Sequence, residues 1–310
     1  MLNDYSILVL AGAVILIITE IYGIYKLIIM RDVTMPGDKG RMAFLYCILI
    51  INVLAIAGSV YVLMLRDISF ETDVCILVGS IFVSVIVFWA IGLYDDSKKQ
   101  AMELLETLVC VLEAGDPNMD GHSLHVHYLA LLIYDYLPYD MRKKINRVDL
   151  SYASLFFDVG KYGVPGRILN KSGKLGSSDW ELIKKHPEIC VGIFESMRSF
   201  NRISDWILYH HERIDGCGYY QIKDDDIPLA SKIIALADTY SSITMRRSYK
   251  PTLTYEDAIA ELKMVAGSQL DEKLVNIFLA IPMRRVEECM EMVNKKMYIY
   301  QQMSKNVSRG

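Results

Sequence analysis

Three apolar runs occupy most of the first 95 residues and constrain the fold more than any other feature: Ile7–Tyr25, Ala43–Leu65 and Val74–Tyr94. A helix of about 20 residues crosses a hydrocarbon core of about 30 Å, because each residue adds about 1.5 Å of rise. Residues 1–95 carry only 13 charged side chains, whereas the whole chain has 33 Lys and Arg and 37 Asp and Glu. The sequence therefore predicts three transmembrane spans (about 7–25, 43–65 and 74–94) in residues 1–95.

Basic residues around these runs predict their orientation. The loop after the first run carries Arg31, Lys39 and Arg41, whereas the loop after the second has a single basic residue beside acidic ones. Lys98 and Lys99 follow the third run. Because loops rich in Lys and Arg stay in the cytoplasm, we expect a multi-pass protein of the cell membrane, with its N-terminus outside and its C-terminal domain cytoplasmic. A cleaved signal peptide is disfavoured, because no basic segment precedes the first run.

Residues 96–115 predict a linker helix that continues from the third run. Apolar residues recur at spacings of three and four residues, which is typical of one face of a helix: Ala101, the pair Leu104 and Leu105, Leu108 and Leu112. Two interpretations of this apolar stripe are open: it joins two copies of the chain in a homodimer, or it packs against the chain's own C-terminal domain. The stripe covers about two heptads, which is too short to establish a coiled coil.

The rest of the chain predicts an all-α domain at 116–303 and a flexible tail at 304–310. Apolar residues recur at helical spacing between loops that contain glycine and proline, and the alternation typical of strands is scarce. The helices that we expect are 120–137, 149–158, 178–199, 201–212, 229–245, 254–266, 271–280 and 283–303. The net charge is −4 and both signs are mixed along this part, so no basic face for bulk nucleic-acid binding is indicated.

All six histidines of the chain lie between positions 122 and 211. Several stand near acidic residues, and one aspartate lies within an apolar helical stretch where its carboxylate needs a partner. Imidazole and carboxylate ligands without thiolates suit iron, manganese, zinc or similar divalent metals, and two such ions can act together on a phosphoryl group. The candidate ligands are His122, Asp158, His186, His210, His211 and Asp238.

Three segments carry a resemblance to a known family: FFDVGKYGVPGRILNKSGKLGSSDWELIKKHPEI, HHERIDGCGYY and IPLASKIIALADTYSSITMRRSYKPTLTYEDAIAEL. From about Asp116 to Ile281 the chain resembles the HD-GYP domain. The resemblance implies a helical metal-dependent phosphohydrolase whose active members hydrolyse the bacterial second messenger cyclic di-GMP. It also implies one or two divalent metal ions per chain (iron, manganese or similar). Members anchored in the membrane behind an N-terminal sensory part are common in that family.

The resemblance also assigns roles to individual residues. It implies that the six candidate ligands hold metal, with Asp158 bridging the ions as a catalytic residue. Lys161 matches the lysine that follows the HD pair, which implies a catalytic residue that holds a phosphate of the substrate. Arg247 and Tyr249 match residues near the end of the signature and are expected to bind substrate.

The sequence departs from the family pattern at several positions. Phe157 replaces the histidine of the HD pair and cannot coordinate a metal. Tyr220 replaces the proline of the GYP signature, so the loop lacks the residue that would stiffen it. His125 and Ser241 stand where the family has an arginine and an aspartate. Because His125 lies one helical turn from His122, it is a candidate substitute ligand; the alternative is that it only takes the place of the arginine.

Two functions from different classes are consistent with these residues. One is a membrane-anchored phosphodiesterase that hydrolyses cyclic di-GMP or a related nucleotide in second-messenger signalling. The alternative is a catalytically impaired HD-GYP module that binds nucleotide or partner proteins without turnover. The retained ligands favour the enzyme, whereas Phe157 and the altered loop favour the impaired module or a one-metal site that hydrolyses another phosphoester. The number of bound metal ions would discriminate between them.

Overall fold

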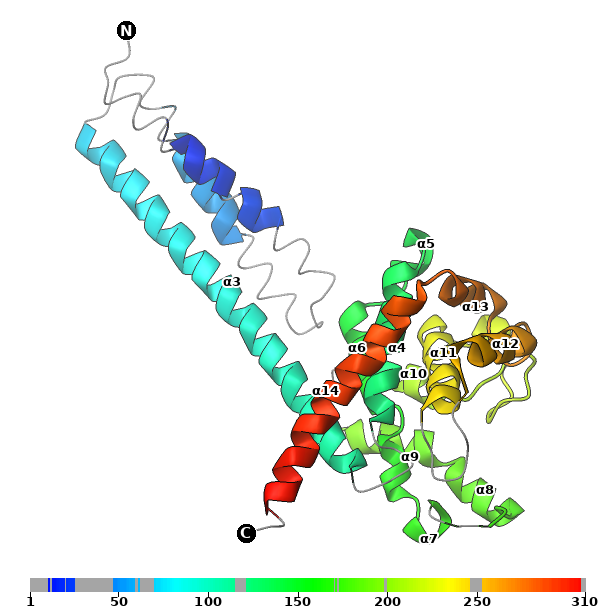
Figure 1. Cartoon of the computed structure of the whole chain (residues 1–310). Helices are drawn as coiled ribbons and strands as arrows, with labels where there is room; N and C mark the ends of the chain where they lie inside the picture. Colours follow the sequence, from blue (N-terminus) through cyan, green and yellow to red (C-terminus); the bar gives the residue numbers. More distant parts are fainter. Residues whose placement is uncertain are drawn as a thin grey trace. The chain divides into compact units, whose positions relative to one another are not determined.

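The chain is all-α in the part that its computed structural model describes, which covers residues 11, 13–19, 21–25, 47–58, 61, 70–114, 121–169, 171, 173–197, 200–245 and 253–307 (Figure 1). Helices make up all of the regular secondary structure in these residues, and the closest approach to a strand is one isolated bridge between Ala266 and Leu270. The predicted all-α class is therefore confirmed. The chain divides into two compact units, 1–102 and 103–310.

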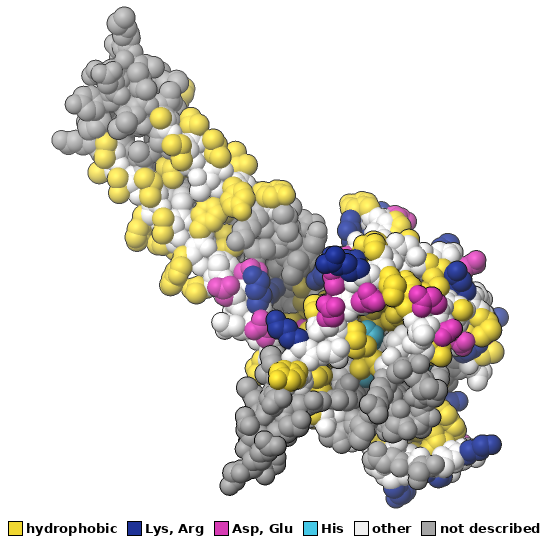
Figure 2. Space-filling view, in the orientation of Figure 1, with side chains coloured by type: hydrophobic (Ala, Val, Ile, Leu, Met, Phe, Trp, Pro, Cys, Tyr) yellow, Lys and Arg dark blue, Asp and Glu magenta, His cyan; other side chains and the backbone are white. Residues whose placement is uncertain are grey.

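In the first unit, helix α3 (Phe70–Glu113) contains the longest apolar stretch of the described residues. From Val78 onward it is long and apolar enough to cross a membrane. Phe82, Val85 and Trp89 expose 66%, 60% and 67% of their surfaces, and Figure 2 shows hydrophobic side chains along this part of the chain. Large apolar side chains exposed in a row are unfavourable in water but suit a lipid environment. One of the three predicted spans thus has structural support.

The other two predicted runs are described only in part. They contain shorter apolar helices, Ala13–Tyr25 and Cys47–Gly58. In the second of these, Asn52 donates hydrogen bonds to the Ser80 carbonyl (3.3 Å) and the Ser84 hydroxyl (3.2 Å) on α3. A hydrogen bond between apolar helices satisfies a polar group that lipid could not. The basic loop residues on which the predicted orientation depends lie outside the described residues, apart from Lys98 and Lys99.

The last three turns of α3 belong to the second unit and have one buried and one exposed face. Glu106, Val109 and Glu113 are buried. The predicted apolar stripe lies on the exposed face, where the exposed fractions are 60%, 50% and 46% for Leu104, Leu108 and Leu112. The interpretation that this stripe packs against the chain's own domain is therefore wrong for these leucines.

In the second unit, α4 (His122–Tyr136) forms the centre of the helical domain. It packs against α6 (Arg147–Phe156), α11 (Leu229–Thr244) and α14 (Met283–Val307), as Figure 1 shows. All but two residues from His122 to Tyr134 are buried, so α4 is covered around most of its circumference, as expected of a core helix. The remaining elements are α5 (Tyr139–Arg142), η2 (Val159–Gly163), α7 (Gly166–Leu169), α8 (Ser177–Ile183), α9 (His186–Phe194), η3 (Phe200–Arg202), α10 (Ser204–Leu208), η4 (Asp224–Asp226), α12 (Tyr255–Val265) and α13 (Glu272–Leu279).

Three of the predicted helices are wrong in extent. The predicted helix 178–199 is divided into α8 and α9, because Pro187 lacks an N–H and fits only the first turn of a helix. The predicted helix 201–212 consists of η3 and α10, and α10 already ends at Leu208. As a result, His186 begins a helix and the two following histidines lie in a turn. At the C-terminal end, α14 extends to Val307, past the predicted end at 303.

Candidate metal centre

Four of the six predicted ligands converge on one point. Each of them offers one ligand atom, and these atoms all lie within 4.8 Å of one another. They come from separate elements: one residue between α6 and η2, one at the start of α9 and two in the turn after α10. We call this set the three-histidine half of the site: Asp158, His186, His210 and His211.

The other two predicted ligands lie beside this set and form a second half. His122 Nε2, on α4, lies 3.0 Å from Asp238 Oδ1, on α11, and 3.8 Å from Asp158 Oδ2. We call His122, Asp238 and the shared Asp158 the His122 half. The structure therefore brings together all six predicted ligands around one carboxylate.

Hydrogen bonds to the backbone fix two of the three rings in the three-histidine half. His186 Nδ1 donates to the Ile183 carbonyl (2.8 Å) and His210 Nδ1 donates to the Ile207 carbonyl (2.6 Å). Because a neutral imidazole carries one N–H, both Nε2 atoms then present lone pairs, and these two atoms are only 3.3 Å apart. Two ligands at about 2.1 Å from a tetrahedral ion would be about 3.4 Å apart. The pair is thus spaced to share an ion.

The carboxylate of Asp158 also fits a cation. Its Oδ2 accepts a hydrogen bond from Lys161 Nζ (2.6 Å), whereas Oδ1 is buried and has no hydrogen-bond partner among the described residues. Oδ1 lies 3.3 Å from His186 Nε2 and 4.0 Å from His210 Nε2. A buried oxygen without a partner is unfavourable. One carboxylate and three imidazoles suit a divalent transition metal, so these residues fit the implied ion.

The charge states of these groups also suit a metal. Burial lowers the pKa of His210 to about 4 and holds the pKa of His211 well below its ordinary value. Burial alone would raise the pKa of Asp158, but Lys161 and the neighbouring imidazoles outweigh it and hold this pKa well below its usual range. Metal ligands must be deprotonated, and at neutral pH these three groups already are.

Phe157 occupies a position beside both halves. Its side chain is fully buried, and its ring centroid lies 6.0 Å from that of His122 and 5.0 Å from that of His210. A phenyl ring fills space but offers no lone pair. The His122 half therefore has one imidazole, whereas the three-histidine half has three.

His125 does not join either half. Burial lowers its pKa to about 3, so the ring is neutral, and its Nδ1 lies 3.0 Å from the Ser241 hydroxyl. This geometry favours the alternative that His125 takes the place of the arginine. His127 is also buried away from the site, with Nδ1 3.0 Å from the Ser151 carbonyl.

Three supporting residues were not singled out in the sequence. A Cβ atom on Gly160 would lie 1.9 Å from the His186 carbonyl oxygen, so only glycine lets η2 approach α9 this closely. Glu212 accepts hydrogen bonds from the backbone N–H groups of Tyr220 (2.6 Å) and Ile222 (2.9 Å) and holds the signature loop. Its position directly after the histidine pair is a signal that could have identified it.

Glu113, at the end of α3, is the third such residue. Its carboxylate is 1% exposed and accepts a hydrogen bond from the backbone N–H of Ser123 (3.0 Å), in the first turn of α4. The backbone N–H groups of a first helical turn lack partners within the helix. Glu113 thus fixes the start of α4 beside His122, and nothing in the sequence pattern indicated this contact.

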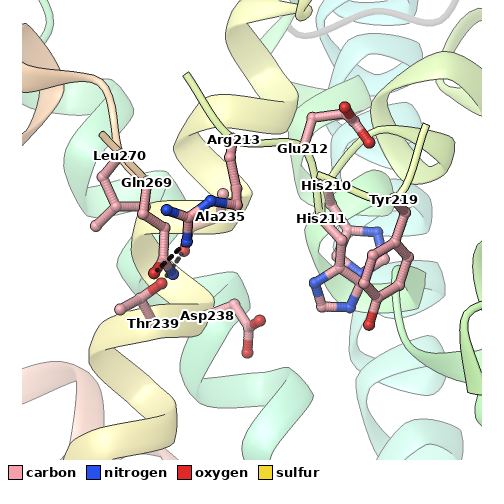
Figure 3. Close-up of a pocket in the computed structure, with 10 residues that line it drawn as sticks. All are labelled: His210, His211, Glu212, Arg213, Tyr219, Ala235, Asp238, Thr239, Gln269 and Leu270. Atoms are coloured by element: carbon pink, nitrogen blue, oxygen red, sulfur yellow. Dashed lines mark hydrogen bonds between the residues drawn. The ribbon is translucent and has the colours of Figure 1, made fainter. Parts of the chain in front are cut away.

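A pocket of about 190 Å³ opens beside the metal centre (Figure 3). Two of the candidate ligands, His211 and Asp238, line this pocket, and Tyr219 of the signature loop lies over the ring of His211. On the other wall, Arg213 donates a hydrogen bond to Gln269 Oε1 (3.1 Å). Two predicted substrate-binding residues, Arg247 and Tyr249, lie outside the described residues.

Comparison with known sequences identifies a family for the residues that form this site. The HD domain family matches residues 115–274. A 3'3'-cGAMP-specific phosphodiesterase 2 of Vibrio cholerae is 33% identical over 196 residues, which cover 62% of this chain and 37% of that protein. A cyclic di-GMP phosphodiesterase of Thermotoga maritima is 30% identical over 182 residues, which cover 58% of this chain and 49% of that protein. The chain therefore spans less than half the length of either relative.

The chain belongs to the HD domain family, which confirms the family predicted from the sequence. Among solved structures, an HDG"Y"P protein from Bdellovibrio bacteriovorus aligns with a TM-score of 0.42 and 16% identity, over 64% of each chain. The family membership rests on the sequence match and not on this alignment.

Proposed function

We propose that this chain is a metal-dependent phosphodiesterase that hydrolyses a cyclic dinucleotide, either cyclic di-GMP or a related molecule. The observation that carries the proposal is the pair of Nε2 atoms of His186 and His210, which face each other at 3.3 Å. They lie beside Asp158 Oδ1, which has no hydrogen-bond partner in the described part of the chain. Relatives named as phosphodiesterases of such dinucleotides support the choice of substrate.

The residues of the site have distinct roles in this proposal. A divalent ion supplies a Lewis acid for the phosphate oxygens and activates water as a nucleophile. The carboxylate of Asp158 is shared by the two halves and contributes its negative charge to both. Lys161, which donates to Asp158, donates instead to a phosphate oxygen when substrate binds. Tyr219 and the loop that Glu212 holds cover one side of the pocket. Arg247 and Tyr249 stay predicted substrate-binding residues.

We further propose that the two halves bind metal unequally. The three-histidine half offers four ligands and holds one ion of iron, manganese or a similar metal tightly. The His122 half offers three and holds a second ion more weakly, with water completing its coordination. The alternative function, a module that binds nucleotide without turnover, is favoured by one observation: Phe157 fills the space beside both halves without a ligand atom.

The domain organisation completes the proposal. Residues 1–95 would anchor the chain with three spans, residues 96–115 would form the linker, and residues 116–303 would form the catalytic domain in the cytoplasm. Residues 304–310, the first four of which continue α14, would follow it. The exposed leucines of α3 would join two copies of the chain. In the full chain in detergent, Leu108→Glu is expected to convert a dimer to a monomer in light scattering, whereas Met264→Glu, at another exposed apolar position, is expected to leave the dimer intact. A monomeric wild type would overturn the dimer.

The function is tested on the full chain, purified in detergent without oxygen. We would measure bound metal by elemental analysis and turnover of cyclic di-GMP and 3'3'-cGAMP by chromatography of the products. Bound metal together with a linear dinucleotide or mononucleotides supports the enzyme. A folded chain that binds dinucleotide without hydrolysing it would instead establish the impaired module.

A further inference from the structure

Ser241 connects the His122 half to a second buried histidine. It lies on α11, one turn after Asp238, and its hydroxyl oxygen is 2.9 Å from His122 Nδ1 and 3.0 Å from His125 Nδ1. All three of these side chains are at most 2% exposed. Two residues that depart from the family pattern at distant sequence positions are therefore in direct contact with each other, and one of them contacts a candidate ligand.

The proton on the His122 ring decides what its other nitrogen can do. A neutral imidazole has one N–H, and the hydrogen bond of one nitrogen selects the tautomer. His122 Nε2 faces Asp238 and Asp158. To present a lone pair there, the ring must carry its proton on Nδ1, and that buried N–H needs an acceptor. The Ser241 oxygen is in place to accept it.

The serine hydroxyl needs an acceptor in turn. It has one hydrogen, which can rotate, and two lone pairs. When its oxygen accepts from His122 Nδ1–H, its own hydrogen can point to His125 Nδ1. Met245 Sδ, at 3.2 Å, is the other neighbour, but sulfur is a weak acceptor. His125 therefore completes a chain of two hydrogen bonds that ends at a neutral ring.

We propose that Ser241 and His125 are positioning residues for His122: a hydroxyl relay that stabilises the tautomer with a free Nε2 lone pair, so that the His122 half can bind an ion. The inference rests on the proposed metal centre. In the relay, His122 Nδ1–H donates to Ser241 Oγ, and Ser241 Oγ–H donates to His125 Nδ1. No ring changes its charge.

The relay also explains how the site tolerates loss of the ion. Without an ion, His122 Nε2 can carry the proton and donate it to Asp238 Oδ1, 3.0 Å away. The Ser241 hydrogen then rotates to His122 Nδ1, and its oxygen accepts from His125 Nδ1–H. Both arrangements leave His122 Nδ1, the Ser241 hydroxyl and His125 Nδ1 with a partner, which a fixed donor or acceptor in place of the hydroxyl would not allow.

The test uses the full chain in detergent with Ser241→Ala, Ser241→Thr and Ser231→Ala. Ser231 is a matched control, because it is also buried on α11 and its hydroxyl donates to the Trp206 carbonyl (2.9 Å), away from the site. Zn²⁺ affinity is measured by competition with a chelator, and thermal unfolding of the metal-free chain shows whether each variant is folded.

The relay predicts that Ser241→Ala lowers the Zn²⁺ affinity of the weaker site, the His122 half, by about 10- to 100-fold. Ser241→Thr, which retains a hydroxyl, and Ser231→Ala are expected to stay near the wild-type affinity. Equal affinity in folded Ser241→Ala overturns the relay, and so does an equal loss in Ser231→Ala. A wild type that binds two ions without turnover contradicts the proposed function and leaves the relay standing. A wild type without a second ion overturns the relay alone.

Discussion

The two halves of the metal centre share Asp158 but differ in what orients their ligands. In the three-histidine half, the rings of His186 and His210 donate to backbone carbonyls within their own turns. In the His122 half, the ring of His122 depends on the side chains of Ser241 and Asp238. Backbone carbonyls remain when side chains change, whereas partners made of side chains can be replaced. Substitutions of side chains can therefore change the orientation of the ligands more readily in the His122 half than in the three-histidine half.

Three of the four departures from the family pattern named above follow this division, and the fourth, Tyr220, lies in the signature loop. Phe157, His125 and Ser241 all contact the ring of His122 or one another. Of these, Phe157 alone also contacts a ring of the three-histidine half. We therefore expect perturbations of the shared carboxylate to affect both ions, and perturbations elsewhere to affect one.

Asp158→Asn is expected to have the largest effect, because it removes the charge that both halves share. The variant should lose both bound ions, and turnover should fall to that of the metal-free chain. Elemental analysis of the purified full chain measures the loss. Asp135→Asn, an exposed aspartate paired with Arg147, serves as the control and should bind metal as the wild type does. Retention of one ion by Asp158→Asn would contradict the shared role of this carboxylate.

His210→Gln should affect only the three-histidine half. It removes the Nε2 atom that faces His186 Nε2 at 3.3 Å, so the tightly bound ion should be lost and the metal content should fall by about one ion per chain. The matched variant is His127→Gln, which changes a histidine that is equally buried but outside both halves. If the two variants bind the same amount of metal, the three-histidine half is not the tighter site.

Phe157→His should make the two halves more alike. An added imidazole beside His122 supplies a fourth ligand, so the weaker ion should bind more tightly. In the metal-free chain the new imidazole is a buried polar group that replaces a phenyl ring. We therefore expect the free energy of unfolding to fall by about 1–3 kcal/mol. Chelator competition and thermal unfolding measure the two effects. Phe156→His, whose ring packs against Phe194 and Phe200, should destabilise the chain without a gain in metal affinity.

The sequence predicted the ligands better than their surroundings. Imidazoles and carboxylates crowded into one stretch are visible as residue types, and the structure brings all six candidates together. The contact between His125 and Ser241 could not be predicted, because it joins α4 to α11 across 116 positions. The closeness of η2 to α9, which requires Gly160, likewise appears only when the helices are packed.

The helix ends show the same limit. Periodicity located α4 and α11 almost to the residue, since each is a long helix with a buried face. Periodicity did not detect the turn between two short helices just before Pro187. Apolar residues on both sides of the turn continue the helical spacing, so the two helices look like one. The spacing of the leucines predicts an apolar stripe on α3, but only burial shows that Leu104 and Leu108 are exposed.

His127 should have the smallest effect on the site and provides a reference for the ligand histidines. Burial lowers its pKa to about 4 from 6.5, so the unfolded chain binds a proton between these pH values while the folded chain does not. The free energy of unfolding should therefore fall as the pH falls from 6.5 to 4, and His127 should contribute about 1.4 kcal/mol per pH unit. His127→Asn, which keeps an N–H donor for the Ser151 carbonyl, should reduce this slope in denaturant unfolding and leave metal content unchanged. A slope equal to that of the wild type would show that His127 binds its proton equally in the folded and the unfolded chain, which contradicts the lowered pKa.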